Sequence, residues 1–133
     1  GCASKSQLGI TSLDDISVYD ESVLSYLYFP NETKVIINES VIIGVDDNWV
    51  GRINLFSGIT KDKIYSYVVE KYKENGWDPV TAFRTENDLM VFQKNEKYIT
   101  IELSDARKIG QETKIIFTLS SKDKKIRINQ ISK

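Results

Sequence analysis

The chain has 133 residues, of which 41% are hydrophobic and 11% aromatic, and a formal net charge of −1. This is enough apolar content for one packed domain and too little positive charge for a general nucleic-acid binder. The chain contains no histidine and one cysteine, which excludes histidine-dependent metal sites, Ser-His-Asp triads, Cys-His dyads and an internal disulfide bond.

The lone cysteine, Cys2, follows Gly1 and precedes Ala3 and Ser4 in a polar stretch without periodicity. This arrangement resembles the lipidation site of bacterial lipoproteins after removal of the signal peptide. Several acyl chains on one cysteine give the stable attachment that a single chain does not. The inner-membrane retention signal of that class is an Asp after the cysteine, so the resemblance implies an outer-membrane destination. The alternative is a cloning remnant or a chance terminal cysteine.

Polar residues dominate the first 20 positions, with only scattered apolar side chains. Such a segment cannot bury enough apolar surface to offset the entropy that is lost on ordering. We therefore expect residues 1–20 to form a flexible, lipidated tether, residues 21–121 a single α+β domain, and residues 122–133 a basic C-terminal tail. Such a basic run is typical of a solvated terminus, and contact with anionic lipid or with a protein partner is the alternative.

Short strands are expected in the first part of the domain. Residues 23–29 are largely apolar and end at Pro30, which cannot donate a hydrogen bond to a sheet, so they predict an edge strand. Two β-branched runs, at residues 35–37 and 41–43, predict two further strands.

The turn-forming residues 46–48 lead into a predicted strand at residues 49–56. In a strand, alternate residues share one face, here Trp49, Gly51, Ile53 and Leu55. The same region superficially resembles the start of a calcium loop, but Val50 stands where such a loop needs an oxygen ligand and Ser57 stands where it needs a bidentate Glu. A turn is therefore the favoured interpretation.

An amphipathic helix at about residues 61–75 is the clearest prediction, with Thr60 as its N-cap. Apolar residues recur along one face: Ile64, Val68 and Tyr72, with Tyr65 and Val69 beside them. Gly76 provides a left-handed stop, and Trp77 follows where the Schellman motif places an apolar residue against the last turn.

After the helix the hydrophobic period changes to two. Four strands are predicted, at residues 80–84, 89–93, 98–103 and 114–119, with a looser loop at residues 104–112 before the last. The other connections are short, which favours an antiparallel meander. We therefore expect an α+β fold in which one main helix packs on an open antiparallel sheet of about five to seven strands.

No catalytic, metal-binding or cofactor-binding group of residues is recognisable. The glycines occur singly, so there is no phosphate-binding loop. None of the 19 acidic residues stands in a setting typical of acid-base catalysis. No apolar run approaches the roughly 20 residues that a membrane-spanning helix needs. We therefore expect a protein that is not an enzyme and uses no cofactor.

The order of the predicted elements resembles that of small bacterial lipoprotein domains. Residues 39–52 come first, a helix closed by residues 75–77 follows, and the strand at residues 97–101 comes next. In this layout the chain resembles the helix-over-sheet domains of BamC, a lipoprotein of the outer-membrane barrel assembly machinery. The resemblance covers roughly residues 35–120 and rests on element order and on the Gly-Trp pair after the helix. Many relatives have a Pro-Gly turn before the first strand, where this chain has Asp-Glu-Ser at residues 20–22. The resemblance implies an envelope protein with an accessory role and assigns no functional residue.

Together, these features predict a non-enzymatic, lipid-anchored protein of the bacterial cell envelope, on the periplasmic side of the outer membrane. We expect it to bind another envelope protein as an assembly or accessory module, with no nucleic-acid partner. The expected interaction surface combines aromatic and basic residues of the sheet and the tail: Trp49, Arg52, Tyr98, Lys124, Lys125 and Arg127.

Two alternatives remain open. The first is a small-ligand-binding domain with a cavity between helix and sheet, lined by Tyr65, Val69, Ile101 and Phe117. The second and less favoured is a small hydrolase, which needs a cleft that holds two carboxylates or an activated Ser/Lys pair.

Overall fold

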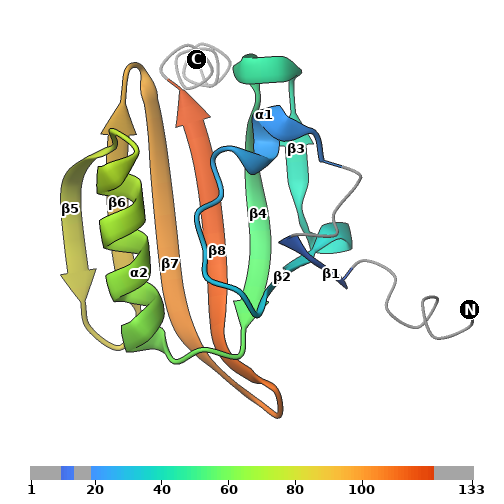
Figure 1. The fold of residues 1–133 in the computed structure, drawn as a ribbon, viewed down its shortest axis with the longest axis vertical. Coiled ribbons are helices and arrows are strands. Elements are labelled where there is room, and N and C mark those ends of the chain that lie inside the picture. The colour runs from blue at the N-terminus through green and yellow to red at the C-terminus, as the bar shows by residue number, and fades with distance from the viewer. Residues whose placement is uncertain (1–9, 14–18, 122–133) are drawn as a thin grey trace, which may run out of the picture.

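The computed structural model describes residues 10–13 and 19–121. In them, an open, eight-stranded antiparallel sheet is accompanied by one main helix (Figure 1). The expected α+β class with an open antiparallel sheet is confirmed, although the sheet has more strands than the five to seven predicted.

The strands are β1 (Ile10–Ser12), β2 (Thr33–Ile36), β3 (Val41–Ile43), β4 (Val50–Ser57), β5 (Asp78–Arg84), β6 (Asp88–Lys94), β7 (Lys97–Lys108) and β8 (Gln111–Ser121). The helices are α1 (Glu21–Leu24) and α2 (Lys61–Glu74), with two short 3-10 turns, η3 (Ile37–Glu39) and η4 (Asp46–Asn48). The order in the sheet is β1-β2-β4-β8-β7-β6-β5, and β3 also pairs with β4.

The prediction of an edge strand at residues 23–29 is wrong, because residues 23 and 24 form the end of α1. The Asp20 carboxylate caps this helix by accepting hydrogen bonds from the N–H groups of Ser22 and Val23. The segment that follows pairs with none of the strands in the described part of the chain. Leu27 and Phe29 are buried in the core, so their alternation with exposed or half-buried neighbours resembled that of a strand.

Part of the expected flexible tether forms β1, which pairs with β2 through Ile10↔Ile36 and Ser12↔Lys34. The edge of β2 offers unpaired backbone groups, and a short β-branched segment can satisfy them. Three residues of the expected tether are therefore paired with the sheet. Cys2 and the tail residues Lys124, Lys125 and Arg127 lie outside the described residues.

The predicted helix is confirmed as α2, and so is its ending. The N–H of Gly76, at φ 88°, donates to the carbonyl of Lys73 at 3.1 Å, and the N–H of Trp77 donates to that of Tyr72 at 2.9 Å. These are the two bonds of the Schellman motif. Thr60 occupies the N-cap position, but its side chain makes no capping hydrogen bond.

The predicted meander is confirmed as β5 to β8, whereas the loop predicted at residues 104–112 is wrong. Strands β7 and β8 extend through this region to a tight turn at residues 109–110. Polar side chains flank both strands there, so the sequence lacks the apolar alternation that would have indicated pairing. The register shifts between Asp105 and Lys108, where Arg107 has a φ of 58°.

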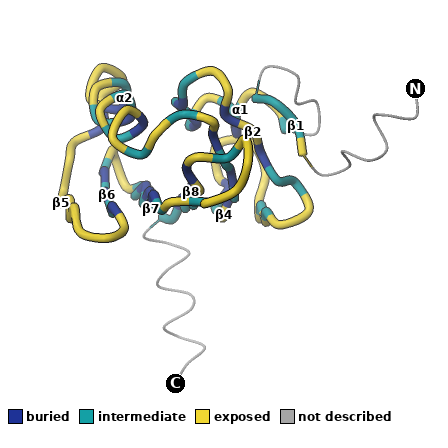
Figure 2. Tube along the Cα trace, turned by 90° about the horizontal axis from the view of Figure 1, so that it is seen from below, coloured by how far each residue is buried: buried dark blue, intermediate teal, exposed yellow. Residues whose placement is uncertain are grey.

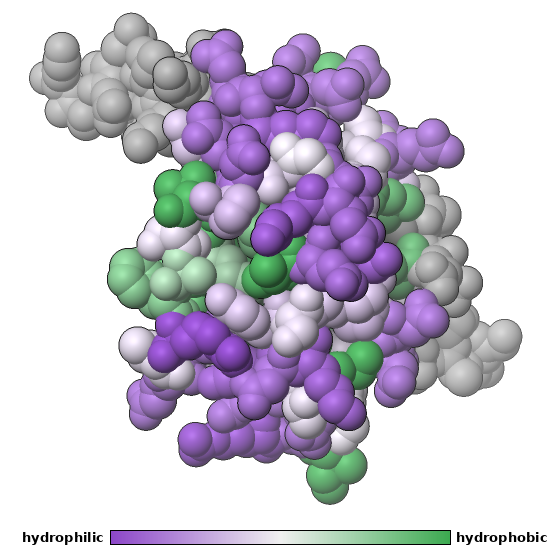
Figure 3. Space-filling view, turned by 60° about the vertical axis from the view of Figure 1, so that its left-hand side comes forward, coloured by the Kyte–Doolittle hydropathy of each residue, from purple (hydrophilic) through white to green (hydrophobic). Residues whose placement is uncertain are grey.

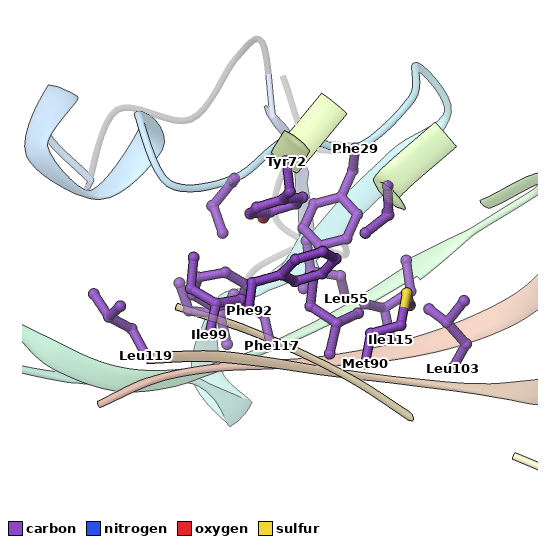
Figure 4. Packing of buried hydrophobic residues seen from close by; sticks show 14 of the residues in the cluster. Phe29, Leu55, Tyr72, Met90, Phe92, Ile99, Leu103, Ile115, Phe117 and Leu119 are labelled. Carbon is purple, nitrogen blue, oxygen red and sulfur yellow. The ribbon is translucent and has the colours of Figure 1, made fainter. Parts of the chain in front are cut away.

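The hydrophobic core lies between the sheet and a layer made of α2 and the segment that follows α1 (Figures 1 and 2). From α2, the side chains of Ile64, Val68 and Tyr72 are fully buried. The ring of Tyr72 stacks on that of Phe92 in β6, with ring centroids 5.1 Å apart (Figure 4). The helix and the central strands therefore share one core.

Candidate functional site

An open pocket of about 350 Å³ lies where the C-terminal end of α2, the β6–β7 turn and the segment after α1 meet. We call it the aromatic–lysine pocket. Its principal side chains come from four separate parts of the chain: Tyr26, Tyr28, Asp47, Trp77, Lys94 and Lys97.

The floor of the pocket is aromatic. Trp77 is only 3% exposed, and the ring of Tyr26 meets it edge-on at a centroid distance of 5.9 Å. Behind Tyr26 lies Trp49, whose ring centroid is 5.6 Å from that of Tyr26 and whose indole N–H donates to the carbonyl of Ser22 at 2.9 Å. These contacts fix the orientation of Tyr26.

Tyr72 attaches the tyrosine wall of the pocket to α2. Its hydroxyl donates to the carbonyl of Tyr26 at 2.6 Å and accepts from the N–H of Tyr28 at 3.3 Å. Burial raises the pKa of Tyr72 far above its usual value, so the hydroxyl stays protonated and remains a donor. The pKa of Tyr28 is raised too, chiefly because its side chain is partly desolvated.

Two lysines from the β6–β7 hairpin complete the pocket. The Lys97 ammonium donates to the Tyr26 hydroxyl at 2.6 Å and to the carbonyl of Asp47, and it lies 4.9 Å from the centre of the Tyr26 ring. The Lys94 ammonium donates to the carbonyl of Asn75 at 2.9 Å and lies 5.9 Å from the centre of the Trp77 ring. Both positive charges are therefore held beside aromatic rings.

The positive charges of the two lysines are not neutralised by a carboxylate within the described residues. The ion pairs found there join Lys71 to Glu74, and Arg84 to Asp62 and Asp88. An ammonium group has three N–H donors. Lys97 uses two and Lys94 uses one, so three of their six donors remain available to an anion in the pocket.

The structure separates the residues of the expected interaction surface. Trp49 is only 1% exposed, so its assignment to the surface is wrong; it lies directly before β4 and is buried in the same core as Ile53 and Leu55. Arg52 is exposed and Tyr98 half-buried on the other face of the sheet, and β8 runs between their strands. Neither of these two residues lines the aromatic–lysine pocket.

The residues expected to line a cavity between helix and sheet lie in or beside the core. Ile101 and Phe117 have no exposed surface. Tyr65 and Val69 are partly buried beside them, and the Arg84 guanidinium lies 4.0 Å from the centre of the Tyr65 ring. Buried hydrophobic side chains, Phe117 among them, pack together between helix and sheet (Figure 4), and the aromatic–lysine pocket opens at the end of the helix instead.

An apolar edge runs along β3 and Val45, and the side chains of Val41 and Ile43 share the outer face of the sheet with Arg52, away from the core. Val41, Ile43 and Val45 are 58%, 59% and 73% exposed, and Val45 is followed directly by η4, which carries Asp47 of the pocket. Within the described residues, β3 pairs with β4 alone, so its other edge is free. The side of the molecule that carries β5 and α2 is different: Figure 3 shows it as mostly hydrophilic, with small separate apolar areas.

Sequence reasoning missed the pocket lysines. Tyr26 and Trp77 stand out as aromatic residues, but nothing local connects them with Lys97, which lies 71 positions from Tyr26. The sole local signal was the Gly-Trp pair that ends α2, because it fixes Trp77 at the helix terminus.

No three histidine, cysteine, aspartate or glutamate side chains of the described residues gather as a potential metal site. No helix in the described part of the chain has the length and apolar character required to cross a membrane.

No protein-family model matches the chain, and no curated protein or solved structure matches it either. The similarity to BamC therefore stays a prediction from element order.

Proposed function

We propose that this chain is a non-enzymatic, lipid-anchored protein of the bacterial cell envelope that binds a carboxylate of another envelope protein in the aromatic–lysine pocket. The observation that carries the proposal is the pair of lysines, Lys94 and Lys97, whose ammonium groups keep three available donors above an aromatic floor. Charge-assisted hydrogen bonds to a carboxylate are among the strongest that a protein makes.

The pocket favours binding over catalysis. The nitrogen atoms of both lysines are tied by hydrogen bonds to backbone carbonyl oxygens, which fix their positions. The tyrosine hydroxyl of the pocket likewise serves Lys97 as an acceptor. These contacts hold positive charge in a fixed place, which is the requirement for recognising an anion.

A protein partner fits the surroundings of the pocket better than a small free acid. The exposed side chain of Val45 lies directly before η4, which carries Asp47 of the pocket, and adds apolar surface there. Together with the half-buried Tyr26 and Tyr28, it provides the mixed aromatic and apolar contact that protein interfaces use. Acyl chains on Cys2 would keep this surface at the membrane, close to other envelope proteins.

A titration followed by NMR tests the binding step. The full chain is titrated with N-acetyl-Gly-Phe as the free acid and as the C-terminal amide. We expect the acid to shift the Trp77 indole signal and to bind at least about tenfold more tightly than the amide, because only the acid accepts charge-assisted bonds. Lys94→Gln should weaken binding of the acid, whereas Lys94→Arg should preserve it.

The control for this titration is Lys108→Gln, which removes a positive charge at the far end of β7. It should leave the affinity for the acid unchanged. Equal binding of acid and amide, or equal weakening by Lys94→Gln and Lys108→Gln, would show that the pocket does not recognise a carboxylate.

A further inference from the structure

A second pocket, of about 360 Å³, lies between β1, the end of α1 and the start of β2. Its apolar walls include Leu13, Leu24, Leu27 and Phe29, and its polar groups include Glu32 and Thr33. It shares no lining residue with the aromatic–lysine pocket, so a ligand in it would bind independently of a carboxylate in the other pocket.

Thr33 has a buried hydroxyl without a hydrogen-bond partner among the described residues, although the residue is only 3% exposed. It belongs to a row of buried hydroxyls that cross the sheet in register, Thr33↔Ser57↔Thr113. The hydroxyl of Ser57 accepts from the N–H of Ile59 at 3.2 Å, and that of Thr113 donates to the carbonyl of Ile59 at 2.7 Å. Thr33 is thus the member of the row that lies at a pocket and is left unsatisfied.

A buried, unsatisfied hydroxyl destabilises a fold, because it loses its hydrogen bonds to water and gains none in return. Val has the same shape as Thr without the hydroxyl and would fit the same buried position on β2. A hydrogen-bond partner on a molecule in the pocket would therefore explain why this position carries a hydroxyl group.

Glu32 supplies the charge at the rim of this pocket. Its side chain is exposed and forms no ion pair within the described residues. Its backbone has a φ of 73°, a left-handed conformation that is unfavourable for residues other than glycine, and its carbonyl accepts from the N–H of Gly58 at 3.3 Å. Glu32 and Thr33 both line the pocket, so a carboxylate and an unsatisfied hydroxyl belong to the same site.

We infer that this pocket binds a primary aliphatic ammonium group on a short hydrocarbon body. The ammonium donates to the Glu32 carboxylate and to the Thr33 hydroxyl, which satisfies both groups at once. The hydrocarbon body packs against the leucines and Phe29. The volume of the pocket is at the lower end of the range for small-molecule sites, which suits a ligand of this size.

Binding of n-pentylammonium to the full chain tests the inference, with 1-pentanol and pentanoate as matched probes without the positive charge. We expect pentylammonium to shift the methyl signals of Leu13, Leu24 and Leu27, and pentanoate to leave them unchanged. Thr33→Val and Glu32→Gln should each weaken the binding of pentylammonium about tenfold. Equal binding of pentanol and pentylammonium, or unchanged affinity in both variants, would overturn the inference.

Thermal unfolding without ligand gives a second readout, because Thr33→Val and Thr113→Val should have different effects on Tm. Removal of the unsatisfied hydroxyl of Thr33 should leave Tm unchanged or raise it, whereas Thr113→Val breaks the bond to Ile59 and should lower Tm. A fall in Tm for Thr33→Val equal to that for Thr113→Val would show that the Thr33 hydroxyl is already satisfied in the protein alone, by an ordered water only, and would refute the site.

The ammonium group has two possible sources, a free amine or a lysine side chain of a polypeptide. N-acetyl-lysine N-methylamide distinguishes them in the same titration. Binding of both this probe and pentylammonium supports a lysine side chain as the natural ligand, and binding of pentylammonium alone supports a free amine.

Discussion

Tyr72 is the residue that connects the core with the aromatic–lysine pocket. Its ring stacks on Phe92 inside the core, and its hydroxyl holds the backbone of Tyr26 and Tyr28 at the pocket wall. The ring thus contributes to stability through packing, while the hydroxyl contributes to the position of the pocket residues. The two roles are separable by a substitution that keeps the ring.

Tyr72→Phe should lower the free energy of unfolding by about 1–3 kcal/mol, because the carbonyl of Tyr26 and the N–H of Tyr28 lose their partner. It should also weaken carboxylate binding. Chemical denaturation and the titration with N-acetyl-Gly-Phe measure the two effects. Tyr98→Phe, on the opposite face of the sheet, is the matched control and should change neither.

The pH dependence of Tyr72→Phe follows from the raised pKa of Tyr72 in the folded protein. An unfolded tyrosine ionises near pH 10, whereas the buried one stays neutral, so the stability that this group contributes is lost as the pH rises above about 10. Phe cannot ionise, and Tyr72→Phe should therefore lose stability less steeply with pH in that range. An identical slope for both proteins would contradict the burial of this hydroxyl.

At the scale of elements, α2 and the hairpin β6–β7 meet at the pocket through Gly76 and Lys94. A Cβ on Gly76 would approach the end of the Lys94 side chain at 3.4–3.5 Å, an ordinary contact, whereas the φ of 88° is unfavourable for any other residue. The ending of α2 therefore fixes the place of Trp77 and, through Asn75, that of the Lys94 ammonium.

Gly76→Ala should lower the free energy of unfolding by about 1–2 kcal/mol, because alanine resists the left-handed conformation. Gly110, at φ 79° with open space around it, is the matched control: Gly110→Ala should have a similar cost in chemical denaturation without changing the NMR signals of Lys94. An unchanged free energy of unfolding for Gly76→Ala would show that the left-handed ending of α2 does not position Trp77 and Lys94.

The same elements show what a sequence can predict. The helix α2 and its ending were predictable because a 3.6-residue period and a Gly-Trp pair are local signals. The segment after α1 was mistaken for a strand because Leu27 and Phe29 alternate, and alternation reports burial without reporting a pairing partner. The extension of β7 and β8 was missed because their distal ends are polar on both faces.

Local sequence patterns could not predict the two candidate sites. The distance of Lys97 from Tyr26 depends on how the β6–β7 hairpin lies against the segment after α1, which no pattern within either segment encodes. The row of hydroxyls that contains Thr33 depends on the register between β2, β4 and β8, and the register is fixed by side chains elsewhere along those strands.

At the scale of the whole molecule, the proposed function needs three parts: an acylated Cys2 as anchor, a helix-bearing sheet as body, and the aromatic–lysine pocket as the contact site. Lys97, which lines the pocket, is the first residue of β7, and the β7–β8 turn lies at the opposite end of this strand (Figure 1). A residue near the β7–β8 turn therefore serves as a control for a residue in the pocket, since a partner that binds the pocket should not contact the turn.

Photo-crosslinking in the native host shows whether the pocket contacts an envelope protein, with the photoreactive residue at Ser25 in the pocket or at Lys108 near the distal turn. We predict that Ser25 captures one envelope protein through an acidic segment and that Lys108 does not. Capture should be lost in Lys94→Gln, kept in Lys94→Arg, and reduced in Cys2→Ser, which should also carry no labelled palmitate. Capture that persists in both Lys94→Gln and Cys2→Ser would mean that neither the pocket nor the anchor brings the partner to this protein.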